Sequence, residues 1–283
     1  MLTIDQHLLN KAFCASTSAL RMTPDFIIIG AMRGGTTSLY SYMTAHPGVG
    51  PAHTKEVHFF DVHHKKGFSW YQAQFPLLVQ KYYTEFLQKR RFITGEASPY
   101  YLFHPHAPKR IVKRLPHVKL IVLLRDPVTR AYSHYHHEVS SGFETLSFAE
   151  AIECEEERIG KEAEKLAQDE QHVSFQHRHF SYLARGIYVD QLQHWMRYFP
   201  REQFLILNSE DFYADPASGL KQALEFVNLP TIGLKVQKEE YEQLNATKPP
   251  KMAEEVRRRL KDYFEPHNAR LAEFLGRDFS WNR

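Results

Sequence analysis

An apolar run followed by a glycine-rich turn stands near the start of the chain and has the spacing of an anion-binding loop. Residues 26–29 are apolar, and Gly30 begins the sequence Gly-Ala-Met-Arg-Gly-Gly-Thr-Thr, which matches G-x-x-x-x-G-K-[ST] except that Thr36 replaces the lysine. A strand, turn and helix in this order aim backbone N–H groups at one point, which suits phosphate or sulfate. That lysine normally reaches the β/γ-phosphates of a nucleoside triphosphate, and no strand ending in Asp is evident to hold Mg²⁺. The loop therefore predicts a nucleotide with a 5′-anion that needs no metal ion, and the alternative is an ordinary glycine-rich turn.

A second apolar segment leads into an arginine and a helix start. Residues 119–124 have the pattern of a buried parallel strand, and Arg125 follows them. Asp126 and Pro127 form the N-cap and first position of a helix, on which Ser133 lies about two turns along. Arginine offers a planar fork for phosphate and serine adds a hydroxyl donor. Arg125 alone would suit a capping or salt-bridge role, but beside the first loop it predicts a second anion site on the same nucleotide.

These two segments, together with Lys-Glu-Val-His-Phe-Phe-Asp at residues 55–61, resemble the sulfotransferase family that uses 3′-phosphoadenosine 5′-phosphosulfate (PAPS). The resemblance is strongest to the heparan-sulfate-type branch of that family and its bacterial relatives. It extends to Gly-Glu-Ala-Ser-Pro at residues 95–99, Arg-Gly-Ile-Tyr at 185–188 and Leu-Gly-Arg-Asp-Phe at 275–279, and so covers most of the chain from about Asp25.

The resemblance assigns the nucleotide to two anion sites. In that family the glycine-rich loop holds the 5′-phosphosulfate and an R-x₇-S element holds the 3′-phosphate, so the cofactor implied is PAPS and its product is 3′,5′-ADP. The nucleotide-binding residues implied in this chain are Arg33, Gly34, Gly35, Thr36, Thr37, Ser38, Arg125, Ser133, Arg185, Gly186 and Tyr188.

The resemblance also places the catalytic groups, with Glu56 as the general base. Many relatives have lysine where this chain has Arg33, and arginine keeps the positive charge but cannot give up a proton. We therefore expect Arg33 and Lys55 to stabilise the leaving phosphate electrostatically. We expect His58 to orient Glu56 or the acceptor, and the alternative is a structural role. The alternative for Lys55 and Glu56 is a solvated charged pair, the usual fate of such residues.

The chemistry of sulfuryl transfer to an alcohol gives these residue types their roles. The reaction needs in-line attack, a base for the hydroxyl proton, and positive charge on the departing oxygen. A sulfuryl group carries less charge than a phosphoryl group, so fixed cations and N–H groups can replace a metal ion. Glu96 is a rival base because it follows the apolar residues 92–94, and its expected use is substrate binding together with Ser98.

The order of apolar runs and helical patterns predicts an α/β fold. We expect a P-loop-like, doubly wound, mainly parallel sheet with helices on both faces, in a single domain over residues 25–283 after an N-terminal extension at 1–24. Gly30, Glu96 and Arg125 then fall at the carboxyl ends of strands, where such sheets bind ligands. The expected strands are residues 26–29, 92–94, 120–124 and 204–208.

A charged stretch between Glu144 and Gln171 interrupts this α/β rhythm. It predicts either a solvated helix or an insertion at about residues 140–185 that covers the acceptor site as a lid.

Composition narrows the range of partners and compartments. The formal charge of +3 is too small to suggest nucleic acid, and residues 1–23 lack the sustained apolar run of a signal peptide or membrane span. Cys14 and Cys154 lie far apart in unlike contexts, which suits a reducing compartment. The seventeen histidines show no zinc-finger or H-E-x-x-H spacing, so no metal is expected. The expectation is a cytoplasmic enzyme, or an excised domain of a larger one, that acts without a membrane.

The sequence leaves the acceptor open. We expect a hydroxyl-bearing acceptor, which is a glycan, a small alcohol or phenol, or a β-hydroxyacyl chain on an acyl carrier protein. The alternatives to a PAPS-dependent sulfotransferase are a metal-dependent P-loop kinase, which Thr36 disfavours, and a non-catalytic nucleotide-binding protein, which Glu56 beside two anion sites disfavours.

Overall fold

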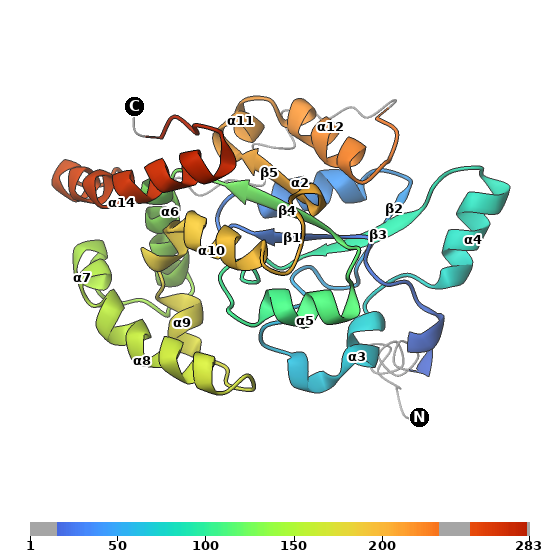
Figure 1. Ribbon diagram of the computed structural model, residues 1–283, viewed down its shortest axis with the longest axis horizontal. Helices are drawn as coiled ribbons and strands as arrows, with labels where there is room; N and C mark the ends of the chain where they lie inside the picture. The colour runs from blue at the N-terminus through green and yellow to red at the C-terminus, as the bar shows by residue number, and fades with distance from the viewer. Residues whose placement is uncertain (1–15, 232–249, 282–283) are drawn as a thin grey trace, which may run out of the picture.

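Five parallel strands form the sheet at the centre of the computed structural model, which describes residues 16–231 and 250–281 (Figure 1). The strands lie in the order β2-β3-β1-β4-β5. Ile28 of the central strand pairs with Ala97 on one side and Ile121 on the other. The strands are β1 (Phe26–Gly30), β2 (Val49–Pro51), β3 (Ile93–Ala97), β4 (Lys119–Leu124) and β5 (Phe204–Asn208). All four expected strands are present, and β2 is an edge strand that the sequence analysis missed.

Helices cover both faces of the sheet because the strands are apolar on both sides. Ile27 and Ile29 of β1 belong to one apolar cluster, whereas Phe26 and Ile28 belong to another. The first cluster is closed by α3 (Phe68–Gln72), α5 (Ala107–Arg114), α10 (Tyr188–Trp195) and part of α14 (Glu254–Leu275). The second is closed by α2 (Thr36–Thr44), α11 (Ser209–Ala214) and α12 (Pro216–Phe226). This arrangement confirms the doubly wound α/β fold in a single domain.

A group of helices beyond the carboxyl ends of the strands contains the charged stretch (Figure 1). Its members are α6 (Pro127–Ser140), α7 (Phe148–Glu153), α8 (Glu155–Gln168) and α9 (Phe175–His179). Ile159 and Leu166 of α8 are buried. The carboxylate of Glu155 is also buried, and it accepts hydrogen bonds from the N–H groups of Leu183 and Ala184 at 2.6 and 2.8 Å. The stretch is therefore packed on one side rather than solvated throughout.

The remaining described elements are short. The 3₁₀ helices are η1 (Ser18–Leu20), η2 (His64–Lys66), η3 (Ala184–Gly186) and η4 (Arg201–Gln203). Helix α4 (Leu78–Leu87) projects beside the β2–β3 edge of the sheet (Figure 1). Within the described part of the chain, every helix is too short or too polar to cross a membrane.

Candidate active site

A cavity of about 690 Å³ lies at the carboxyl ends of the strands, where the glycine-rich loop, the segment at 55–58 and helix α6 meet. Its size falls in the range of small-molecule sites. The expected site residues that line it are Arg33, Gly35, Thr36, Thr37, Ser38, Lys55, Glu56, His58, Arg125, Ser133 and Arg185. The structure thus brings most of the residues expected for nucleotide binding and catalysis to one place.

The backbone of the glycine-rich loop packs closely against the backbone of β4. Gly35 is the N-cap of α2 and has a φ of 96°, a conformation that favours glycine. A Cβ at Gly34 would lie 2.6 Å from the carbonyl oxygen of Leu123 in β4, so this position also requires glycine. No described side chain caps α2, and its first residues, Thr36 and Thr37, line the cavity. The N-terminus of α2 is therefore available to an anion in the cavity.

The two motifs that the sequence separates by about a hundred residues are in direct contact. Arg33 Nε donates to Ser133 Oγ at 3.0 Å, and Arg125 Nη1 donates to the carbonyl oxygen of Arg33 at 3.1 Å. Burial lowers the pKa of Arg33, and the positive charge of Arg125 lowers it further. The two cationic side chains are held together although they repel each other.

Four arginines line the cavity without a carboxylate partner among the described residues: Arg33, Arg125, Arg178 and Arg185. Arg185 is almost fully buried, its guanidinium lies 4.7 Å from the ring centroid of Tyr100, and burial lowers its pKa to about 10. A buried cation without a counter-ion is costly. The cavity therefore suits an anionic ligand such as a nucleotide with two phosphate groups.

Glu56 faces the cavity between two cationic groups. Its carboxylate accepts hydrogen bonds from Lys55 Nζ at 2.9 Å and from His58 Nε2 at 3.2 Å. Burial raises the pKa of Glu56, but the hydrogen bonds from His58 and Lys55 outweigh it and lower the pKa to about 2. The carboxylate is ionised at neutral pH, and its side chain is about a third exposed to the cavity (35%). It can therefore accept a proton from an entering hydroxyl.

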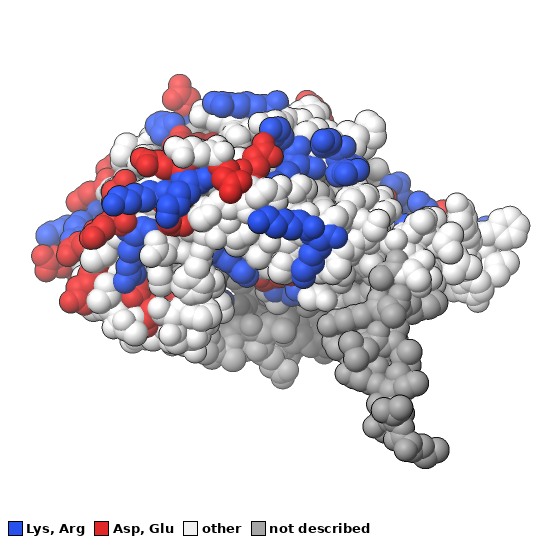
Figure 2. Space-filling view, turned by 90° about the horizontal axis from the view of Figure 1, so that it is seen from below, with Lys and Arg blue, Asp and Glu red and all other residues white. Residues whose placement is uncertain are grey.

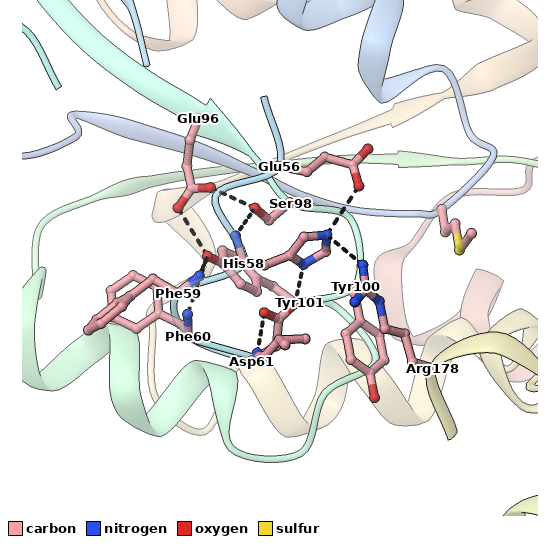
Figure 3. Close-up of polar contacts among 12 residues, drawn as sticks. Glu56, His58, Phe59, Phe60, Asp61, Glu96, Ser98, Tyr100, Tyr101 and Arg178 are labelled. Carbon is pink, nitrogen blue, oxygen red and sulfur yellow. Dashed lines mark hydrogen bonds and ion pairs between the residues drawn. The ribbon is translucent and has the colours of Figure 1, made fainter. Parts of the chain in front are cut away.

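His58 is held between two carboxylates (Figure 3). Its Nδ1 lies 2.7 Å from Asp61 Oδ2, whose side chain is fully buried, and its Nε2 faces Glu56. Burial lowers the pKa of His58, but Asp61 and Glu56 outweigh it and raise the pKa to about 9. The imidazole is therefore protonated at neutral pH and donates to both carboxylates. Arg178 Nη2 also approaches His58 Nε2, at 3.2 Å.

Glu96 and Ser98 lie beneath this group and do not line the cavity. Ser98 Oγ accepts a hydrogen bond from the N–H of His58 at 3.1 Å and donates to Glu96 Oε2 at 2.6 Å (Figure 3). Tyr71 donates to Glu96 Oε1 at 2.7 Å. Burial raises the pKa of Glu96 to about 7, although the hydrogen bond from Ser98 opposes this shift. Both side chains are fully buried. The structure therefore places them as supports for the His58 backbone rather than as substrate contacts.

Gly186 and Tyr188 likewise stand behind the cavity rather than in its lining. The hydroxyl of Tyr188 donates to the carbonyl oxygen of Arg125 at 2.8 Å. A Cβ at Gly186 would lie 2.6 Å from the ring of Phe264. These residues are placed to position Arg125 and to let α14 approach.

The sequence analysis missed several residues of the lining. Glu138 is the second carboxylate in the cavity, and its Oε2 lies 2.8 Å from His179 Nδ1. Burial raises the pKa of Glu138, but contact with His134 and His179 outweighs it and lowers the pKa to about 2. The i, i+4 spacing of His134 and Glu138 on α6 was the available signal. Phe143 and Arg178 also line the cavity and have no motif around them.

The remaining sequence expectations concern metals and cysteines. Among the described residues, no group of three or more His, Cys, Asp or Glu side chains is placed to hold a metal ion. Cys154 is a free, partly buried thiol, and Cys14 lies outside the described residues.

Comparisons with known proteins find similar sequences and a similar fold. The model of the family described as "Sulfotransferase domain" matches residues 23–260. The chain is 30% identical to heparan sulfate glucosamine 3-O-sulfotransferase 3B1 of Mus musculus over 94% of this chain and 67% of that protein. It is 29% identical to the membrane-associated sulfotransferase kil1 of Dictyostelium discoideum over 91% of this chain and 66% of that protein. Among solved structures, a sulfotransferase from Alicyclobacillus acidocaldarius superposes with a TM-score of 0.70 at 30% identity, over 93% of this chain and 100% of that one.

Proposed function

We propose that this chain, which belongs to the sulfotransferase domain family and is a PAPS-dependent sulfotransferase, transfers the sulfuryl group to a hydroxyl of a glycan. The observation that carries the proposal is the ionised carboxylate of Glu56, which faces a cavity lined by four arginines that lack carboxylate partners among the described residues. A base beside an anion site is what transfer from PAPS to an alcohol requires. Similarity to heparan sulfate 3-O-sulfotransferases supports a glycan as the acceptor.

The donor nucleotide is assigned to the part of the cavity formed by the loop, Arg125 and the stretch of α6 around Ser133. We assign the 5′-phosphosulfate to the N-terminus of α2 at residues 35–38, and the 3′-phosphate to Arg125 and Ser133. Arg33 lies between the two sites because its side chain bonds Ser133 while its carbonyl accepts from Arg125. Bound there, PAPS supplies the sulfuryl group that is transferred. The fixed arginines offset the negative charge of the nucleotide without a metal ion.

Glu56 and Lys55 are coupled, and this coupling suggests how the base is activated. In the structure Lys55 is paired with Glu56 at 2.9 Å. A phosphate at the end of α2 would compete for the same ammonium group. If Lys55 bonded that phosphate instead, Glu56 would lose one of the contacts that lower its pKa, and its affinity for the hydroxyl proton would rise. His58 remains bonded to Asp61 and keeps the carboxylate in place.

The acceptor is assigned to the part of the cavity lined by Glu138 near the end of α6, Phe143 and His179. Phe143 and Phe175 are each about half exposed, and Phe175 stacks on His179 with ring centroids 4.2 Å apart. Phe143 and His179 line the cavity beside Glu138. An aromatic face suits the apolar C–H face of a pyranose ring, and a carboxylate accepts hydrogen bonds from its hydroxyl groups. Phe143 and His179 lie within the segment at about 140–185 that the sequence analysis expected to cover the acceptor, and we retain that role for it.

A transfer assay with labelled PAPS tests the proposal. Purified protein is incubated with heparan sulfate, with simple alcohols and phenols, and with a β-hydroxyacyl carrier protein. We expect label on the glycan and none from labelled ATP with Mg²⁺. Label only on the phenol or only on the carrier protein would overturn the glycan assignment, and absence of transfer to any acceptor would overturn the enzymatic assignment.

We further propose that the enzyme works in the cytoplasm. The support is the low cysteine content and the free thiol of Cys154. Cell fractionation of the tagged protein tests this location. Recovery in the secreted or lumenal fraction would contradict it.

A further inference from the structure

Helix α4 presents an apolar stripe to solvent. Five of its ten residues form the stripe, and their exposed fractions are 66% for Val79, 64% for Tyr82, 55% for Tyr83, 72% for Phe86 and 62% for Leu87. Their spacing is i, i+3, i+4, i+7 and i+8, which is the pattern of the face that a helix normally packs against its core. Figure 2 shows the surface around this projecting part of the molecule as largely free of charge. A contiguous apolar surface of this kind marks an interaction site.

The contacts at both ends of α4 fix the stripe in this orientation. Thr84, on the opposite side, is buried. Glu85 Oε1 accepts from the N–H of Phe92, the residue that leads into β3, at 3.2 Å. At the other end Leu77 forms an isolated antiparallel bridge with Arg21. The helix is therefore attached by its polar side, and the apolar stripe faces outward.

Basic residues flank the apolar stripe. Lys89, Arg90 and Arg91 follow the end of the helix in exposed positions. Lys89 Nζ lies 4.7 Å from the ring centroid of Phe86. Aromatic and aliphatic residues on one face, with basic residues beside them, are typical of helices that lie in the interface of an anionic membrane.

We propose that α4 docks the enzyme on an anionic lipid surface. The stripe would enter the headgroup region, while the flanking basic side chains meet the lipid phosphates and carboxylates. A second copy of the chain fits the surface less well, because a stable dimer buries roughly 800 Å² on each partner and a helix of ten residues offers far less. The like charges at residues 89–91 would also repel across such a contact.

The position of α4 leaves the cavity open when the stripe is docked. The helix stands beside the β2–β3 edge, whereas the cavity lies at the carboxyl ends of the strands (Figure 1). Docking therefore concentrates the enzyme at a surface without covering Glu56. Docking on a membrane differs from the expectation, drawn from the sequence, of an enzyme that acts without one. The inference does not depend on which acceptor is used.

Flotation of the full chain with lipid vesicles tests the proposal. The vesicles consist of phosphatidylcholine alone or of phosphatidylcholine with phosphatidylserine. We expect binding to the anionic vesicles that weakens as salt is added, since screening shortens the reach of the basic residues. The double change Tyr83→Ser and Phe86→Ser should weaken binding by roughly tenfold or more because it removes two aromatic rings from the interface. Lys89→Gln should weaken it by about fivefold, the scale of one charge near an anionic surface.

Matched controls separate docking from a general loss of apolar surface. Tyr263 and Phe274 on α14 are 40% and 38% exposed, and changing both to serine should leave vesicle binding unchanged. Circular dichroism and transfer to a soluble acceptor confirm that each variant is folded. Failure of the unchanged protein to bind anionic vesicles would overturn the proposal, and so would equal losses in the α4 and α14 variants. A dimer seen by light scattering that the α4 variant abolishes would assign the stripe to a second copy instead.

Discussion

Replacing Glu56 by glutamine tests the proposed chemistry at its reacting atom. The amide keeps the shape of the side chain but cannot accept the hydroxyl proton. General-base catalysis contributes roughly 10²- to 10⁴-fold, so turnover should fall by that factor, which corresponds to about 3–5 kcal/mol in the activation barrier. Rapid-quench measurement of a single turnover with labelled PAPS gives the rate of the chemical step directly.

The same change should leave stability and nucleotide affinity nearly unaltered. The side chains of Lys55 and Glu56 are 34% and 35% exposed, and an ion pair with this exposure contributes less than about 1 kcal/mol. Glu56 also stands outside the two anion sites assigned to the nucleotide. Loss of turnover from unfolding or from poor donor binding would therefore be visible in thermal melting and in calorimetry with 3′,5′-ADP.

Glu138→Gln is the matched control because Glu138 is the other carboxylate in the cavity, and its pKa is also lowered to about 2. As an acceptor contact it should mainly raise the acceptor KM. If Glu56→Gln retains near wild-type turnover while Glu138→Gln abolishes it, Glu138 is the base. Glu96→Gln provides a second control, because Glu96 acts through Ser98 and the His58 backbone. Loss of turnover only in the Glu96 variant would return the role of base to that buried carboxyl.

The remaining predictions concern the nucleotide, the metal and pH. Arg125→Ala should weaken binding of 3′,5′-ADP much more than that of 5′-AMP in calorimetry, because Arg125 is assigned to the 3′-phosphate, and equal losses would refute the assignment. Turnover should survive EDTA because arginines supply the positive charge, and loss that a divalent ion restores would contradict this prediction. Burial raises the pKa of Glu96 from 4.5 to about 7. The folded protein therefore loses stability as the pH rises through that interval, because ionisation of this carboxyl is less favourable in the folded state. The free energy of unfolding of Glu96→Gln relative to wild type should therefore increase by up to about 3 kcal/mol between pH 4.5 and pH 8, and a difference independent of pH would show that Glu96 is not the titrating group.

The fold was largely predictable because its strands are buried on both faces. Continuous apolar runs such as residues 120–124 identify parallel strands without any alternation, and glycine and proline mark where they end. The edge strand β2 escaped because it has only three residues and ends in the exposed Pro51. This segment is a strand because it pairs with β3, and that pairing leaves no pattern in the local sequence.

The glycine-rich loop of the site was predictable because its backbone geometry requires glycine at particular positions. Gly34 indicates the close approach of the loop to β4, and Gly35 indicates its left-handed turn into α2. Glu96 was expected to contact the substrate, but its side chain is buried and does not line the cavity, because a position near the carboxyl end of a strand does not reveal which way the side chain points. Phe143 and Arg178 reach the cavity from separate turns of the helical segment between β4 and β5, and only the tertiary fold brings them together.

Arginine at position 33 changes how the positive charge of the site is shared. Its guanidinium donates to Ser133, so its charge is fixed near the assigned 3′-phosphate side of the cavity. The ammonium group of Lys55 lies beside Glu56, where that carboxylate faces the cavity. Because a guanidinium cannot give up its proton, we expect Arg33 to supply fixed charge and Lys55 to supply the ammonium group beside the proposed base. The departure from the family pattern is therefore compatible with transfer, provided that Lys55 is free to leave Glu56 as the donor binds.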